Sequence, residues 1–140
     1  MSISTPIEKM MALLLADSAV TELVDRRIWG GHRQPPESEN YRPESDAAIV
    51  FAQDGGNDNY PGTVNGVRWM FKFYGCDEVQ ANALYQVVAD LLFHDGRKLE
   101  RAQAKVFNTI KESGPIDGSE PETDWDYVLM FCRAHVVARN

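Results

Sequence analysis

Residues 64–96 read VNGVRWMFKFYGCDEVQANALYQVVADLLFHDG, and the change of hydrophobic period at Gly75 decides the fold. Before Gly75, apolar and polar residues alternate, which predicts a strand with one buried face. After it, apolar residues recur at helical spacing, which predicts an amphipathic helix over residues 76–95 that stops at Gly96. The predicted inward residues are Val67, Trp69, Phe71 and Phe73 on the strand, and Val79, Ala83, Leu84, Val87, Val88, Leu91 and Leu92 on the helix. The core is expected to centre on Trp69, Phe71, Phe73, Val87 and Leu91.

The N-terminal part of the chain predicts two helices followed by a polar loop. Thr5 is a suitable N-cap and Pro6 suits the first helical position. The apolar residues that follow keep helical spacing, so we expect two short helices within residues 6–25. Residues 30–46 are polar, contain three prolines and show no periodicity, which is typical of a surface loop.

The residues just before the deciding stretch predict a hairpin over residues 47–74. The sequence AAIVFAQ, residues 47–53, is a compact apolar strand, and DGGNDNYPG, residues 54–62, has the composition of a hairpin tip. Ile49 and Phe51 should then lie across from the aromatic residues of the following strand in an antiparallel pair.

Two more strands are predicted near the C-terminus, at residues 104–111 and 125–137. The second is apolar on both faces in its first part, so it should be central in the sheet or covered by another chain. The sequence therefore predicts a single α+β domain over residues 1–140. We expect a mostly antiparallel sheet of four to five strands, with the long central helix and the N-terminal helices packed on one face.

Charge is unevenly distributed along the chain. There are 14 basic and 21 acidic residues, a net charge of −7, which argues against a protein that grips phosphate backbones. Six acids and no lysine or arginine lie between Glu112 and Asp126. We expect a solvated loop there; the alternatives are a wall facing an anion and a docking loop for a basic partner. The candidate lumen or partner residues are Glu112, Asp117, Glu120, Glu122 and Asp124, and further candidate partner contacts on polar loops are Arg33, Glu37, Tyr41, Arg42, Asp54, Asn57 and Tyr60.

No motif for catalysis, metal or cofactor binding is found. The three histidines and two cysteines lack zinc-ligand spacing, and both thiols are expected to be reduced and buried. The run from Asp54 to Asn59 lacks the ligand spacing and downstream glutamate of a calcium loop. No apolar run could cross a bilayer and no signal peptide is evident, so we expect a cytosolic, non-enzymatic protein with no cofactor and no metal.

Four blocks carry a resemblance to a known family. They are LLLADSAVTELVDRRIW at residues 13–29, AAIVF at 47–51, VRWMFKFYGCDEVQANALYQVVADLL at 67–92 and WDYVLMFCRAHV at 125–136. In this order the chain resembles the tail-terminator (tail-completion) proteins of long-tailed bacteriophages. The loops at residues 32–46 and 112–126 are longer than the family pattern, so their roles are not carried over.

The resemblance implies a structural virion protein assembled in the host cytoplasm. It implies a homo-oligomeric, hexameric ring that caps the tail tube protein and joins it to a neck or connector protein. DNA would pass through the bore without sequence-specific binding, and acid in that conduit would let DNA slide by repulsion. The alternatives are a head-completion or connector subunit bound to the portal, and a cellular oligomeric binding module.

Overall fold

Helices and strands follow one another in the predicted order. The computed structural model describes residues 6–36, 39–43, 46–60, 64–94, 106–121 and 123–137, and of these the side chains at 55–60, 64–66, 94, 106–108 and 135–137 are not described. The elements are α1 (Pro6–Ala16), α2 (Ser18–Val24), β1 (Ile28–Gly30), β2 (Ala48–Tyr60), β3 (Val64–Tyr74), α3 (Glu78–Ala89), a short π-helix η2 (Asp90–His94), β4 (Val106–Ser119) and β5 (Asp126–Val137).

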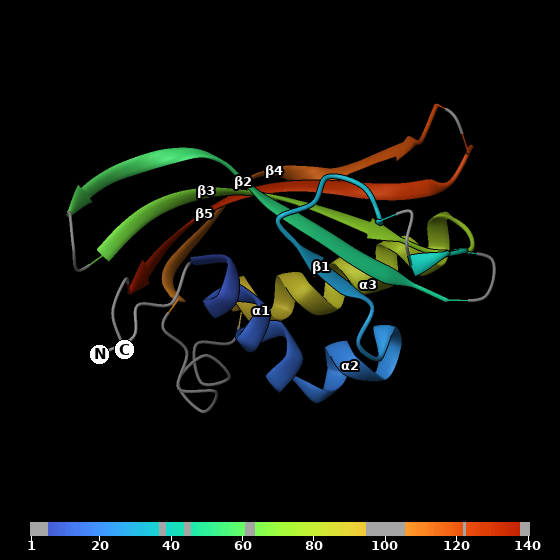
Figure 1. The fold of residues 1–140 in the computed structure, drawn as a ribbon, viewed down its shortest axis with the longest axis horizontal. Coiled ribbons are helices and arrows are strands. Elements are labelled where there is room, and N and C mark those ends of the chain that lie inside the picture. Colours follow the sequence, from blue (N-terminus) through green and yellow to red (C-terminus); the bar gives the residue numbers. More distant parts are fainter. Residues whose placement is uncertain are drawn as a thin grey trace.

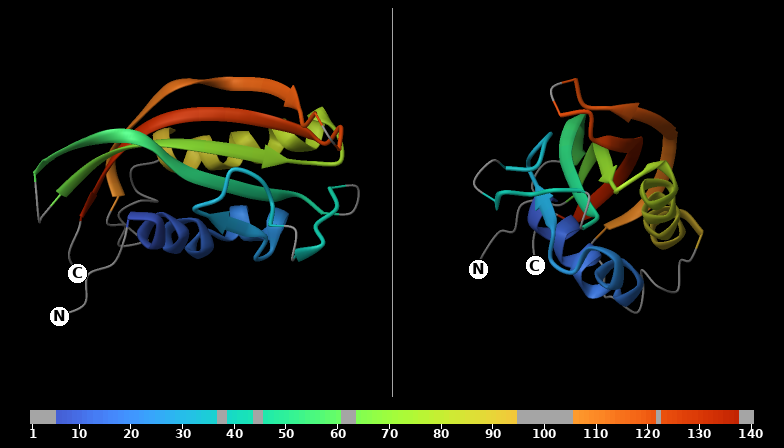
Figure 2. Two further views of the ribbon diagram at one scale, coloured as in Figure 1. Left: turned by 45° about the horizontal axis from the view of Figure 1, so that its top comes forward. Right: turned by 90° about the vertical axis from the view of Figure 1, so that its right-hand side faces the viewer.

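The five strands form one sheet in the order β1-β2-β3-β5-β4. β1 pairs with β2 in parallel, and the other three pairs are antiparallel. Figure 1 shows the strands running along the long axis, with the end of β2 and the start of β3 at one end and the end of β4 and the start of β5 at the other. Residues of α1, α2 and α3 share one core with alternate residues of the sheet, so the helices lie on one side of it (Figures 1 and 2). This is an α+β fold.

The hairpin forms with the predicted register. Ile49 is opposite Phe73 and Phe51 is opposite Phe71, so the aromatic residues face the helices together. Phe71 stacks on Phe51 at 5.5 Å and on Phe73 at 5.9 Å between ring centroids. With Trp69 also fully buried, these rings form the centre of the core, as predicted.

The tip of this hairpin lies further along the chain than predicted. β2 continues to Tyr60, so most of residues 54–62 is strand; residues 61–63 are not described. The register shifts between Gln53 and Gly56 and again between Asn57 and Tyr60. Glycine and asparagine, which favour turns, also favour the irregular backbone of bulges, and here they produce bulges in a long strand.

Helix α3 begins two residues later than predicted and faces the sheet with a different stripe. The Asp77 side chain accepts a hydrogen bond from the Gln80 N–H at 2.9 Å. Leu84, Val88, Leu91 and Leu92 are buried as predicted, but Val79 is 78% exposed, Ala83 is exposed and Val87 is half-buried. Their place is taken by Ala81, Tyr85 and Ala89.

The junction between β3 and α3 is closely packed at Gly75. A Cβ at Gly75 would lie 2.6 Å from the Ala81 N, so the end of β3 meets the first turn of α3 on the Ala81 side. Downstream, the π-helix adds a residue to its turn, which brings both Leu91 and Leu92 inward. The predicted stop at Gly96 lies outside the described residues.

β4 is much longer than predicted. The expected strand at residues 104–111 starts at Val106 in the described part and runs to Ser119, so most of the acidic segment is strand rather than loop. Three register shifts along β5 accommodate it. β5 lies between β3 and β4, as expected for a strand that is apolar on both faces.

The face of the sheet opposite the helices, called the outer face here, is partly covered by the chain itself. The Arg68 guanidinium lies 4.4 Å from the Phe131 ring centroid, and the Lys72 ammonium lies 4.7 Å from that of Tyr127. On β4, Ile110 and Ile116 stay 61% and 44% exposed. Another copy is therefore not required to shelter the whole of this face.

Candidate functional site

The loop that follows β1, described at residues 31–36, 39–43 and 46–47, packs on the outer face through Tyr41. This side chain is 8% exposed, and its hydroxyl donates to the Asp46 carbonyl at 2.6 Å. Its ring packs edge-to-face against Trp29 at 5.5 Å and Trp125 at 5.6 Å. In the structure Tyr41 holds the loop against the β4–β5 turn, and its predicted contact with a partner stays a prediction.

Glu120, in the β4–β5 turn, holds this turn against strand β3 of the sheet. It is 6% exposed, and its Oε1 accepts from the Lys72 Nζ at 2.8 Å and from the Tyr74 hydroxyl at 2.6 Å. Its Oε2 is 3.5 Å from the Gln34 Nε2, at the long limit of a hydrogen bond. Burial, together with the hydrogen bond to Glu120, raises the pKa of Tyr74 far above its ordinary value, so the phenol stays a donor.

The loop and the turn enclose a cleft between them. Its volume is about 400 Å³, within the range of small-ligand sites. Aromatic and proline side chains line much of the cleft, while Glu120 contributes a buried carboxylate. The lining residues are Gln34, Pro35, Pro36, Asn40, Tyr41, Arg42, Glu120, Pro121, Thr123 and Trp125.

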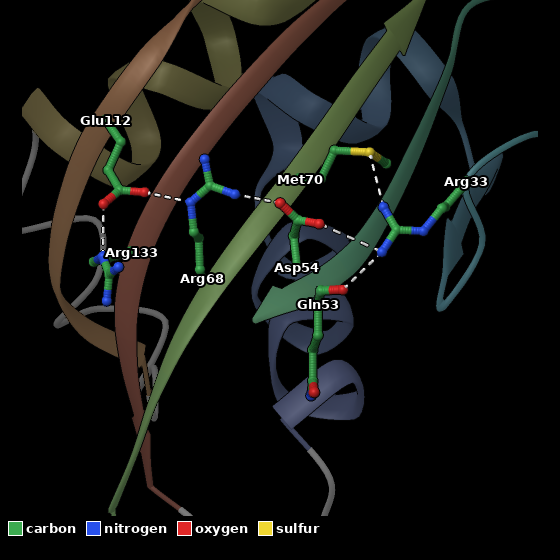
Figure 3. Close-up of polar contacts among 7 residues, drawn as sticks. All are labelled: Arg33, Gln53, Asp54, Arg68, Met70, Glu112 and Arg133. Atoms are coloured by element: carbon green, nitrogen blue, oxygen red, sulfur yellow. Dashed lines mark hydrogen bonds and ion pairs between the residues drawn. The ribbon is translucent and has the colours of Figure 1, made fainter. Parts of the chain in front are cut away.

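A row of alternating charges crosses the outer face (Figure 3). Arg68 is at its centre and pairs with Asp54 on β2 and, through its Nε at 2.7 Å, with Glu112 on β4. Arg133 reaches the other oxygen of Glu112 at 2.6 Å, and Arg33 reaches the other oxygen of Asp54 at 3.5 Å. We call these five residues the arginine–carboxylate row. Each carboxylate is shared by two arginines, one at each oxygen.

The row lowers the pKa of Glu112 and covers apolar surface. Hydrogen bonds from Arg133 and then Arg68 hold the pKa of the Glu112 carboxyl below its usual range. Arg33 also contacts the Met70 sulfur at 3.5 Å and donates to the Gln53 carbonyl at 3.2 Å (Figure 3). The arginine side chains thus tie four strands and the loop together over partly apolar residues.

The predicted partner residues separate into two groups in the structure. Tyr41, Arg42 and Glu120 meet in the cleft, whereas Arg33, Asp54 and Glu112 belong to the row. Asp117 faces the helices, where it accepts from the Asn82 amide at 3.1 Å, and Asp124 is exposed in the turn. Glu37 and Glu122, and the side chains of Asn57 and Tyr60, lie outside what the structure describes.

The sequence prediction missed the cations and rings that complete both features. Lys72, Tyr74 and Trp125 support the cleft, and Arg68 and Arg133 bind the acids of the row. A signal for two of them exists: Arg68 and Lys72 alternate with the buried aromatics of β3, which places both on the outer face. The alternation does not show which strands lie beside β3, so it does not identify the acids that pair with Arg68 and Lys72.

The thiols differ from expectation in one respect. Cys132 is buried, and burial raises the pKa of its thiol to about 12, which makes it a poor nucleophile. Cys76 is exposed, although both were expected to be buried. Among the described residues, no group of three or more histidine, cysteine, aspartate or glutamate side chains could hold a metal ion.

Comparison with known proteins does not assign the chain to a family. No protein-family model matches the chain. A search of curated proteins finds no match either. Within the part of the chain that the structure describes, none of the helices has the length and apolar composition needed to span a membrane.

Proposed function

We propose that this protein is a non-enzymatic structural subunit of the neck of a long-tailed bacteriophage. In this proposal, copies of the chain form a ring, hexameric in the resembled family, that caps the tail tube and joins it to a neck or connector protein. DNA passes through the bore without sequence-specific contacts.

The observation that carries the proposal is the order of the elements on which the resemblance rests. Two helices, the hairpin, the central helix and the last two strands follow one another as that resemblance requires. The strands also run along the molecule, so the end of β2 and the start of β5 lie at opposite ends of it (Figure 1). A subunit that joins two different partners needs contact surfaces that are well separated in this way.

The structure changes which acids are available to a DNA conduit. Glu112 is held by two arginines, Glu120 is buried on Lys72, and Asp117 is bonded to Asn82. Glu112 and Glu120 are thus paired with cations, which leaves Asp117 and Asp124, both exposed, as the described candidates for a repulsive wall. We predict that the β4–β5 turn faces the bore of the proposed ring.

One observation favours a second candidate, a binding module that acts through the cleft. The outer face is partly sheltered by Arg68, Lys72 and the loop, so ring formation is not needed to cover the apolar strand β5. A monomeric or dimeric binding protein is compatible with the same fold.

Phage particles that lack the protein would separate the two candidates. With a stop codon in the gene, we expect filled heads and tails that fail to join, seen by electron microscopy. Supplying the full chain from a plasmid should restore joined particles. Normal joined virions from the mutant phage would contradict the proposed function.

A further inference from the structure

We propose that the cleft between the loop and the β4–β5 turn is a docking site for an arginine side chain of a partner protein, held by Glu120 Oε2 and Trp125. This inference goes beyond the ring and does not depend on it. It rests on a pattern of contacts that the outer face repeats twice and that the cleft leaves incomplete.

The pattern concerns how the outer face uses its carboxylates. Asp54 and Glu112 each bind two arginines, one at each oxygen. Glu120 binds a cation, Lys72, through Oε1 alone; Oε2 has the Gln34 amide at 3.5 Å among the described contacts. A carboxylate accepts about four hydrogen bonds, so Oε2 has acceptor capacity left. Because Gln34 itself lines the cleft, that oxygen lies on the cleft side.

Aromatic rings complete the pattern. Arg68 lies over Phe131 and Lys72 over Tyr127, each cation also bound to a carboxylate of the same face. The cation–ring contacts found in the described part of the chain do not involve Trp125, although indole is the best ring for such a contact. The cleft therefore offers a ring and a carboxylate oxygen that no cation contacts in the described part of the chain, although Arg42 is among the residues that line it.

The shape and charge of the site favour arginine over other guests. A planar guanidinium can stack on an indole while it donates hydrogen bonds to a carboxylate, which an ammonium does less well. Prolines 35, 36 and 121 provide apolar walls for the methylene groups of a side chain. Arginine, tryptophan and tyrosine are also the residues that most often anchor protein interfaces. A protein with net charge −7 attracts a basic partner.

The test uses a blocked arginine as the probe. N-acetyl-arginine amide is titrated into the ¹⁵N-labelled full chain, and the indole N–H resonance of Trp125, assigned with Trp125→Phe, is followed. For a group of this size anchored at one site we expect saturable binding with a Kd of about 1 mM. The citrulline analogue, which has the same shape and no charge, should bind at least about tenfold more weakly.

Variants of the chain test the assignment to Glu120. Glu120→Gln should weaken binding of the blocked arginine about tenfold. Because this variant could also disturb the turn, a second variant, Thr123→Trp, leaves Glu120 in place. Thr123 is an exposed residue that lines the cleft, so the larger side chain should block the cleft in a folded protein. The matched control is Asp124→Asn, which removes an acid of the same turn and keeps a residue that tolerates its φ of 60°. It should bind within about twofold of the original chain.

The absence of a saturable shift of the Trp125 indole N–H resonance would overturn the proposal, and so would equal binding of the arginine and citrulline probes. An equal loss of affinity in Asp124→Asn and Glu120→Gln would also overturn it, because it would mean a general attraction to acidic residues. Free arginine binding tenfold more tightly than the blocked probe would indicate a metabolite site instead. A tenfold gain in Arg42→Ala would mean that the chain's own arginine fills the site.

Discussion

Glu120 shows how one carboxylate changes the structure of a segment that looks like a solvated loop. Its hydrogen bonds to Lys72 and Tyr74 fix the turn on the outer face, and the loop then packs on the turn through Tyr41 and Trp125. Removing one partner of a buried charged pair leaves the other charge uncompensated, which is why such contacts are costly to break.

Tyr74 gives a prediction for stability at high pH. Its pKa is raised in the folded state, so above pH 10.0, the ordinary tyrosine value, the unfolded chain loses this proton while the folded chain keeps it. The free energy of unfolding should therefore be unaffected by this group below pH 10 and should fall above it, by about 1.4 kcal/mol per pH unit from Tyr74 alone. Urea denaturation at several pH values measures this.

The comparison for that prediction is Tyr74→Phe. This variant should be less stable near neutral pH, because Glu120 loses a donor, but its stability should fall less steeply above pH 10. Equal slopes in the two proteins would contradict the role given to Tyr74.

Helix α3 gives a prediction at the scale of an element, where sequence and structure disagree. Leu84 is fully buried and Val79 is 78% exposed, although both were predicted to face inward. Leu84→Ala should lower the free energy of unfolding by about 2–5 kcal/mol, and Val79→Ala should change it by less than about 0.5 kcal/mol. Chemical denaturation of both variants checks this; a larger loss in Val79→Ala would mean that the helix is rotated the other way.

Local patterns were sufficient to predict most elements and their order. The alternation in β3 placed Trp69, Phe71 and Phe73 in the core, and the proline at the first helical position placed the start of α1. The helical stripe was ambiguous because apolar residues extend around α3. Ala81, Tyr85 and Ala89 form part of the buried side, which the periodicity alone does not reveal.

β4 and the cleft could not be predicted because they depend on pairing between distant residues. Residues 112–126 contain six acids and no lysine or arginine, which is typical of a solvated loop. Their partners are Arg68 and Lys72 on β3 and Arg133 on β5, which only the strand order β3-β5-β4 brings near. The distribution of charge along the chain therefore predicted a loop wrongly. Ion pairs between neighbouring strands of the sheet explain why most of this segment belongs to β4.

At the scale of the whole molecule, features of both long edges discourage pairing with another sheet. β4 has two bulges around Ser113 and carries an exposed proline, Pro115, and Arg33 covers the Gln53 carbonyl beside a bulge in β2. Contacts between copies would then use side chains rather than backbone edges. Ile110 and Ile116, the exposed isoleucines of β4, are the apolar residues best placed for this.

The proposed ring on the tail tube is tested most simply by the assembly state of the full chain, measured with and without a tail tube. The purified protein, alone and mixed with tail tubes of the phage that encodes it, is examined by sedimentation velocity and by negative-stain electron microscopy. We predict rings of identical subunits seated on the end of the tube. A protein that stays monomeric at every concentration and leaves the tube ends bare would contradict the proposed function.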